Sequence, residues 1–252
     1  MRRFGMTLRE RPVELPGMLR SPGQPFGLYV HVPFCVTRCG YCDFNTYTPA
    51  ELGGVNPDAW LLALRTELEL AAARLDAPTL NTVFVGGGTP SLLGGERLAT
   101  LLRMVRDCFS LEPDAEITTE ANPESTWPEF FDAIRAAGYT RVSLGMQSVA
   151  PRVLATLDRV HSPGRAAAAA REAMDAGFEH VNLDLIYGTP ESPTTICCVR
   201  WTPRSTPVST TCRPTPWSSR RERRWPGASG AVSSQSRTTT CSPAATGWPT
   251  WR

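Results

Sequence analysis

The feature that most restricts the fold of this chain is the alternation of short apolar strands with amphipathic helices between residues 27 and 187. Strand patterns occur at 27–32, 81–85, 116–120, 141–144 and 180–187, and helical periodicity occurs at 58–74, 95–109, 127–137, 151–157 and 164–176. Strands separated by helices form parallel sheets. We therefore expect an α/β fold, a partial and truncated TIM-like barrel, in which the loops after the strands share one face.

Three cysteines, Cys35, Cys39 and Cys42, follow the first predicted strand within eight residues. Pro33 ends that strand, so the thiols lie on the loop that leaves it. Thiolates suit zinc, copper or an iron–sulfur cluster. No obvious fourth ligand closes a zinc tetrahedron, because His31 lies on the strand and more often packs or donates a hydrogen bond there. Three thiolates on a four-iron cluster leave one iron open, whereas spacing alone also permits a zinc site or redox-active thiols.

Glycine or polar residues mark the ends of the later strands as well. In Gly86-Gly-Gly-Thr89, absent side chains would let the backbone approach a ligand, although a triple glycine is also common in tight turns. Glu120 ends the third strand, and Gln147 follows the fourth, with Arg159 a dozen residues further on. Asp184 lies within the apolar fifth strand, where a carboxylate needs a partner, so a structural salt bridge and a ligand contact are its two candidate roles.

In this order, the motifs resemble those of the radical S-adenosylmethionine (SAM) family, in the branch of the oxygen-independent coproporphyrinogen III oxidases, over residues 26–190. In that family three cysteines hold a [4Fe–4S] cluster whose open iron binds SAM, and reduction cleaves SAM to a 5′-deoxyadenosyl radical. The resemblance implies that Cys35, Cys39 and Cys42 are the cluster ligands. The SAM-binding positions that it implies are Tyr29, Tyr41, Gly87, Gly88, Thr89, Glu120, Gln147, Arg159 and Asp184.

The second residue after the third cysteine separates two groups within this branch. The coproporphyrinogen III oxidases carry a further cysteine there, whereas this chain has Phe44. The sequence Cys-Asp-Phe-Asn instead resembles the related heme chaperones of the HemW group. The resemblance therefore implies a protein that binds a cluster, SAM and heme, and that delivers heme to acceptor apo-proteins. Oxidative decarboxylation of coproporphyrinogen III to protoporphyrinogen IX is the alternative, and a non-enzymatic barrel with structural zinc is another.

The composition changes abruptly after residue 191. Residues 1–191 carry 17 Arg and 23 Asp plus Glu, for a net charge of −6, whereas residues 192–252 carry nine Arg and one Glu, for +8. These last 61 residues contain no Leu, Phe, Tyr, Asp or Asn, so they cannot bury enough apolar surface to offset their ordering entropy. We expect an irregular lead-in over 1–26, a radical SAM core over 27–191 and a low-complexity, disordered tail over 192–252.

The distribution of charged and apolar residues also limits which partners and which cellular compartment we expect. The arginines of the tail are scattered and no packed module presents them, so we expect no nucleic-acid partner. The chain has no run of about 18 apolar residues, so we expect no integral membrane segment. Its first residues lack an apolar signal core, and free thiols persist in reducing compartments, so we expect a cytoplasmic protein.

We predict that the tail is a frameshifted reading of the gene. Read one base earlier, with third codon positions left free, the codons for residues 206–219 can encode an acidic segment that resembles residues 175–181. The product would then lack the last barrel strand and the C-terminal domain, and we would expect it to be unstable or inactive. Resequencing across the codons for residues 187–219 tests this: a missing base should restore an acidic, leucine-containing frame, and an unchanged sequence would refute the prediction.

Overall fold

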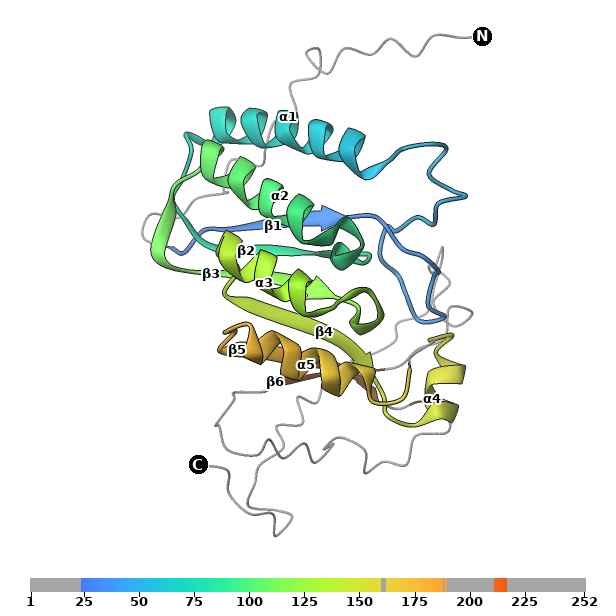
Figure 1. Ribbon diagram of the computed structural model, residues 1–252. Helices are drawn as coiled ribbons and strands as arrows, with labels where there is room; N and C mark the ends of the chain where they lie inside the picture. Colours follow the sequence, from blue (N-terminus) through green and yellow to red (C-terminus); the bar gives the residue numbers. More distant parts are fainter. Residues whose placement is uncertain (1–23, 160–161, 188, 190–210, 217–252) are drawn as a thin grey trace, which may run out of the picture.

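A parallel sheet forms the centre of the computed structural model, which describes residues 24–159, 162–187, 189 and 211–216 (Figure 1). The sheet has six strands in chain order, β1-β2-β3-β4-β5-β6, and every neighbouring pair is parallel. Parallel pairing sends the carboxyl ends of all strands to one edge of the sheet. The strands are β1 (Gly27–Val32), β2 (Leu80–Gly87), β3 (Leu111–Ala121), β4 (Arg141–Gln147), β5 (His180–Tyr187) and β6 (Thr211–Pro216).

Four of the crossover helices lie along one face of this sheet (Figure 1). They are α1 (Pro57–Leu75), α2 (Gly94–Cys108), α3 (Pro128–Ala137) and α5 (Arg165–Asp175). The short helix α4 (Pro151–Thr156) lies beyond the carboxyl end of β4, and two 3₁₀ turns, η1 (Pro90–Leu93) and η2 (Pro123–Ser125), follow β2 and β3. The α/β architecture and the ten predicted strands and helices are therefore confirmed.

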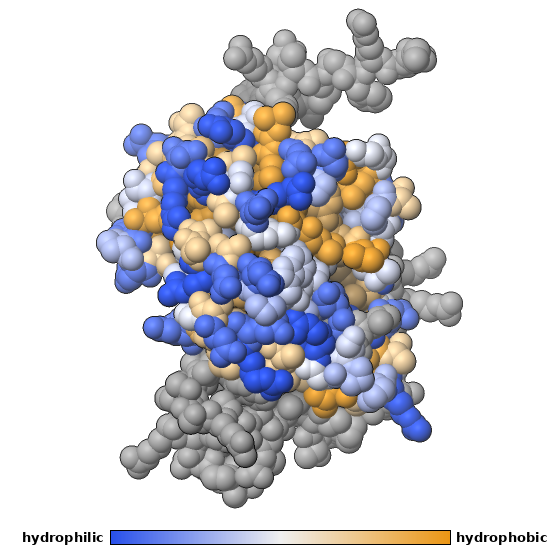
Figure 2. Space-filling view, in the orientation of Figure 1, coloured by the Kyte–Doolittle hydropathy of each residue, from blue (hydrophilic) through white to orange (hydrophobic). Residues whose placement is uncertain are grey.

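Local sequence explains where α1 begins and which side it buries. The side chain of Asn56 caps the helix by accepting a hydrogen bond from the Ala59 amide at 2.9 Å, and a proline occupies the first turn. Leu61, Leu64 and Leu68 recur at helical spacing and are buried. The outward surface of the helical layer mixes hydrophilic and apolar side chains, as solvent-facing helices do (Figure 2).

The apolar core fills the space between the sheet and the helices. Val83 and Val85 of β2 and Leu98 of α2 belong to it and are almost completely buried. Because strand side chains alternate between faces, the residues between them face the other side, which the four long helices do not cover. That second face would be the interior of a closed barrel. No helix among the described residues is long and apolar enough to cross a membrane.

Two elements differ from the sequence-based boundaries. β3 begins at Leu111 instead of residue 116, since Leu111 pairs with Leu80 ahead of a register shift. β6 falls inside the predicted tail, because the free edge of β5 can pair through backbone groups alone. Its Pro214 and Pro216 have no backbone N–H, which suits an edge strand. The remaining residues of the predicted tail, and most of the lead-in, lie outside the described residues.

Tyr139 offers a test of this core. Its side chain is fully buried, and its hydroxyl donates to the Leu98 carbonyl of α2 at 3.0 Å. Replacing Tyr139 with Phe should lower the free energy of unfolding by about 1 kcal/mol, because a buried hydrogen bond is lost. Tyr47→Phe is the control, since it removes an exposed hydroxyl bond and should cost less than about 0.5 kcal/mol. Equal losses in urea unfolding would contradict the prediction.

Candidate functional site

The cysteine loop, defined here as residues 33–56, is closed by its own backbone. The Cys35 amide donates to the Tyr47 carbonyl at 3.0 Å, and the Tyr47 amide donates to the Pro33 carbonyl at 2.8 Å. Arg38 braces the loop from within, with Nε donating to the Thr46 carbonyl at 3.0 Å. The loop leaves β1 at the carboxyl edge of the sheet (Figure 1). It therefore holds three free, partly buried thiols beside the ends of the other strands.

Each thiol of this loop lies next to a side chain that can donate a hydrogen bond to sulfur. Burial raises the pKa of the Cys35 thiol, and the hydrogen bonds from Thr89 and Thr46 oppose that rise. Such donors stabilise anionic sulfur, the form that binds metals. The pairs are Thr89 Oγ1 with Cys35 Sγ (3.8 Å), Thr46 Oγ1 with Cys42 Sγ (3.9 Å) and Arg159 Nη1 with Cys39 Sγ (3.4 Å).

The chemistry of the donor set fits an iron–sulfur cluster. A structural zinc ion needs four ligands in a compact tetrahedron. Three thiols on one loop, with hydrogen-bond donors at their sulfur atoms, instead match the ligands of an iron–sulfur cluster.

The glycines at the end of β2 are required by the close approach of their backbone to β1 and to the start of the cysteine loop. Gly87 has φ of 114°, and a Cβ atom there would lie 2.6 Å from the His31 ring. A Cβ atom on Gly88 would lie 2.5 Å from the Phe34 carbonyl oxygen. Only glycine avoids both the strained backbone and the collision. The triple glycine is therefore a contact surface and more than a tight turn.

Backbone hydrogen bonds join this glycine segment to its neighbours. The Gly88 amide donates to the Val32 carbonyl and the Thr89 amide to the Phe34 carbonyl, each at 2.7 Å. On the other side, the Gly87 amide donates to Oε2 of Glu120 at 3.1 Å. The Cys35 thiol, which Thr89 contacts, and the Glu120 carboxylate of β3 therefore lie close to the same partly buried backbone segment.

Tyr29 and His31 link β1 to the end of the cysteine loop. The Nε2 atom of His31 lies 2.8 Å from the Asn45 carbonyl, so it carries the ring proton, and Nδ1 accepts from the Tyr29 hydroxyl at 3.0 Å. The Tyr29 ring stacks on Phe84, with centroids 6.0 Å apart. Burial, and next the charge of Glu120, raise the pKa of Tyr29. His31 thus holds the predicted cofactor-binding residue Tyr29 in place.

Asp184 lies in a polar cluster on the barrel-interior face. It accepts from the Ser143 hydroxyl at 2.9 Å and from the Asn182 amide at 2.8 Å, and that amide also reaches the Ser143 hydroxyl at 2.7 Å. The Oδ1 atom of Asn182 is buried and has no hydrogen-bond partner among the described residues. Sequence reasoning missed Ser143 and Asn182, although both fall at period-two positions on strands that carry Gln147 and Asp184.

Tyr41 lies under α4. Its ring packs against a small apolar cluster of Val153, Leu157 and Ile186. Burial raises the pKa of Tyr41, and the charge of Arg159 acts in the opposite direction. The residue therefore anchors the part of the cysteine loop between Cys39 and Cys42, whether or not it also contacts a ligand.

Gln147 and Arg159 meet at the carboxyl end of β4. Gln147 has φ of 64°, a left-handed conformation, and the pairing of β4 with β5 shifts register between Gly145 and Gln147. The Nη2 atom of Arg159 donates to the Gly145 carbonyl at 3.1 Å. A backbone irregularity of this kind often redirects a side chain near a functional site.

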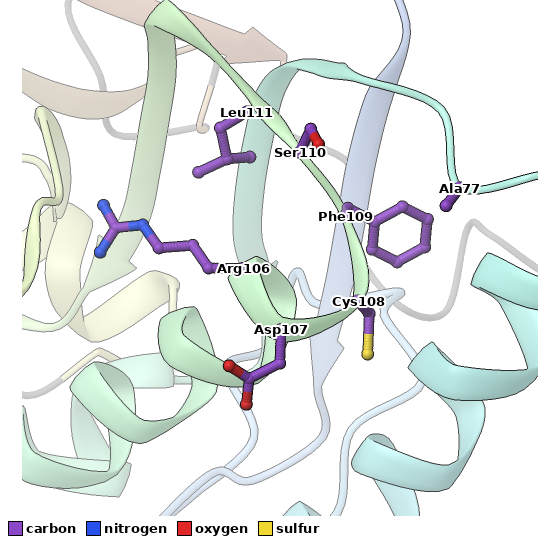
Figure 3. A pocket seen from close by; sticks show the side chains of 7 residues that line it. All are labelled: Ala77, Arg106, Asp107, Cys108, Phe109, Ser110 and Leu111. Atoms are coloured by element: carbon purple, nitrogen blue, oxygen red, sulfur yellow. The ribbon is translucent and has the colours of Figure 1, made fainter.

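A hollow elsewhere on the surface is not part of this site. It lies at the opposite edge of the sheet, where α2 ends and β3 begins, and is wide open to solvent (Figure 3). In α/β barrels, ligands bind at the carboxyl edge. The residues that line the hollow are Ala77, Arg106, Asp107, Cys108, Phe109, Ser110 and Leu111.

Comparison with known proteins identifies the family. The sequence profile of the Radical SAM superfamily matches residues 29–196, a range that includes all the candidate site residues. The chain belongs to the radical SAM superfamily. Members of this superfamily use a [4Fe–4S] cluster and SAM, so these two cofactors, predicted from the motifs, are confirmed. Which side chains of this radical SAM protein contact them stays a prediction.

The individual similar proteins are heme chaperones and a coproporphyrinogen III oxidase. The heme chaperone HemW of Mycobacterium tuberculosis is 83% identical over 185 residues, covering 73% of this chain and 47% of that protein. HemW of Escherichia coli is 42% identical over 174 residues, covering 69% and 45%. The structure of the radical SAM enzyme coproporphyrinogen III oxidase (HemN) from Escherichia coli superposes with a TM-score of 0.62 at 32% identity, covering 69% of this chain and 39% of that one. The chain spans about half the length of the curated relatives it matches.

Gly94 serves as a control for the effect of steric crowding at Gly87. Gly94 also has a positive φ, of 77°, but no atom of the described part of the chain lies within 4 Å of an added Cβ atom. Gly94→Ala should cost about 1 kcal/mol of stability from backbone strain alone. Gly87→Ala should cost roughly 2 to 4 kcal/mol, because strain and collision add. Urea unfolding checks this, and similar losses for both variants would contradict the described packing.

Proposed function

We propose that this chain is the cluster- and SAM-binding part of a radical SAM heme chaperone. The observation that carries the proposal is the high identity, 83% over 185 residues, to a protein named heme chaperone HemW. Phe44 also supports the chaperone proposal. The resemblance implies that the coproporphyrinogen III oxidases of this branch carry a cysteine at the position of Phe44. The Phe44 side chain is 62% exposed at the surface of the cysteine loop.

In this proposal Cys35, Cys39 and Cys42 hold the cluster. The backbone hydrogen bonds that Tyr47 makes with Cys35 and Pro33 keep the cysteine loop closed at the carboxyl edge of the sheet. When bound, the cluster would supply the electron for reductive cleavage of SAM. We propose that the glycine segment lies against the polar end of SAM; its Gly87, Gly88 and Thr89 amides already donate hydrogen bonds within the protein. Glu120 adds a carboxylate next to that backbone, which suits a positively charged amino group.

The remaining proposed SAM-binding residues are assigned from where they lie near the carboxyl edge of the sheet. Tyr29 is braced by His31, Gln147 and Arg159 meet at the end of β4, and Asp184 lies below them in its polar cluster. We propose that these residues and Tyr41 bind SAM.

Heme, or a related porphyrin, is the proposed cargo, and heme-accepting apo-proteins are the proposed partners. We propose that the protein works in the cytoplasm, because its thiols are free and reducing conditions keep them available for a cluster. Coproporphyrinogen oxidation is the second candidate, favoured by the structural similarity to HemN.

Metal content tests the cluster assignment. After anaerobic reconstitution with iron and sulfide, the chain should hold about four irons, matched by sulfide, and its [4Fe–4S] EPR signal should change on addition of SAM. Replacing Cys35, Cys39 and Cys42 together with Ser should abolish iron binding. Cys108→Ser is the matched control, because Cys108 is also a free thiol but lies at the far end of α2. Stoichiometric zinc without the EPR signal would refute the assignment.

Heme and coproporphyrinogen separate the two candidate functions. Heme added to the chain should remain bound through gel filtration. Anaerobic incubation of the reconstituted protein with coproporphyrinogen III, SAM and a reductant should give no vinyl product. Formation of protoporphyrinogen IX without retained heme would replace the chaperone proposal with the oxidase.

A further inference from the structure

We propose that Arg159 sets the reduction potential of the cluster through its hydrogen bond to Cys39. This inference rests on the proposed role of Cys39 as a cluster ligand. It gives Arg159 a function that does not depend on whether Arg159 also binds SAM. The observation behind it is the 3.4 Å distance between Nη1 of Arg159 and Sγ of Cys39.

The contact is imposed by the way that the cysteine loop docks on the end of α4. The Gly40 amide donates to the Leu157 carbonyl at 3.1 Å. A Cβ atom on Gly40 would lie 2.5 Å from Oδ2 of Asp158, so any larger residue would have to displace that side chain. Gly40 follows Cys39, and Arg159 follows Asp158. The docking therefore brings the guanidinium and the thiol to the same place.

The guanidinium is also held from its other side. Its Nη2 atom donates to the Gly145 carbonyl of β4 at 3.1 Å, while Nη1 faces the sulfur. The backbone amide of Arg159 donates to the Leu154 carbonyl at 2.9 Å, which fixes the start of the side chain. A guanidinium held by two bonds, on a backbone fixed by a third, does not need to reorganise when the charge of its neighbour changes. The planar fork of Arg suits this bridge, whereas the single ammonium of Lys cannot reproduce both bonds.

A fixed cation beside a ligating sulfur favours the more negative, reduced form of the cluster. Hydrogen bonds to sulfur and local net charge are two of the main determinants of iron–sulfur potentials. The contact is partly buried, so solvent screens it less than a surface charge. Arg159 should therefore raise the reduction potential.

The test is an EPR-monitored redox titration of the reconstituted chain and of three variants. Arg159→Gln removes the charge, and Arg159→Lys keeps the charge but loses the two-pronged geometry. Arg152→Gln is the matched control, since Arg152 lies on α4 and is exposed. Arg159→Gln should lower the reduced-to-oxidised ratio at a fixed potential by at least tenfold, equivalent to about 59 mV for a one-electron couple. Arg159→Lys should fall between wild type and Arg159→Gln, and Arg152→Gln should match wild type.

The outcomes separate this inference from the function on which it rests. If wild type binds no iron, the cluster proposal fails and this inference fails with it. If the cluster forms and Arg159→Gln titrates like Arg152→Gln, the inference alone is overturned. If Arg159→Gln does not assemble a cluster, Arg159→Lys decides: a lower potential than wild type supports the inference, and an unchanged potential overturns it.

Discussion

Parallel pairing of the strands is the constraint on which the rest of this structure depends. It sends every strand out of the sheet at the same edge, so loops that are far apart in sequence become neighbours. The cysteine loop after β1 and the glycine segment after β2 meet in this way. Glu120 of β3 reaches the same backbone, and Arg159 reaches the cysteine loop from beyond β4. The strand topology, more than any single contact, therefore brings the groups of the site together.

Glycine makes the second contribution, because it lets backbones approach where side chains would collide. Gly87 and Gly88 allow the segment after β2 to touch β1 and the start of the cysteine loop. Gly40 does the same between the cysteine loop and the end of α4. These three glycines let the cysteine loop contact both the segment after β2 and the end of α4. The backbone that we propose for SAM binding and the thiols that we propose as cluster ligands are consequently held by the same few hydrogen bonds.

The sequence predicted the order and type of the elements well, because each strand and helix carries its own apolar period. Leu61, Leu64 and Leu68, for example, specify the buried side of α1 without help from the rest of the chain. Boundaries that depend on pairing could not be predicted in this way. The early start of β3 at Leu111 and the pairing of β6 with β5 both use backbone bonds to a neighbour, and these leave no periodic signal.

For the site, the sequence by itself determined the chemistry: three thiols at fixed spacing, a glycine segment and polar residues at strand ends. Only the tertiary structure decided which groups meet. Ser143 and Asn182 surround Asp184, and Arg159 reaches Cys39, because strands β4 and β5 pair and the cysteine loop docks on α4. Residue type is a local property of the chain, whereas a contact between residues 39 and 159 exists only after folding.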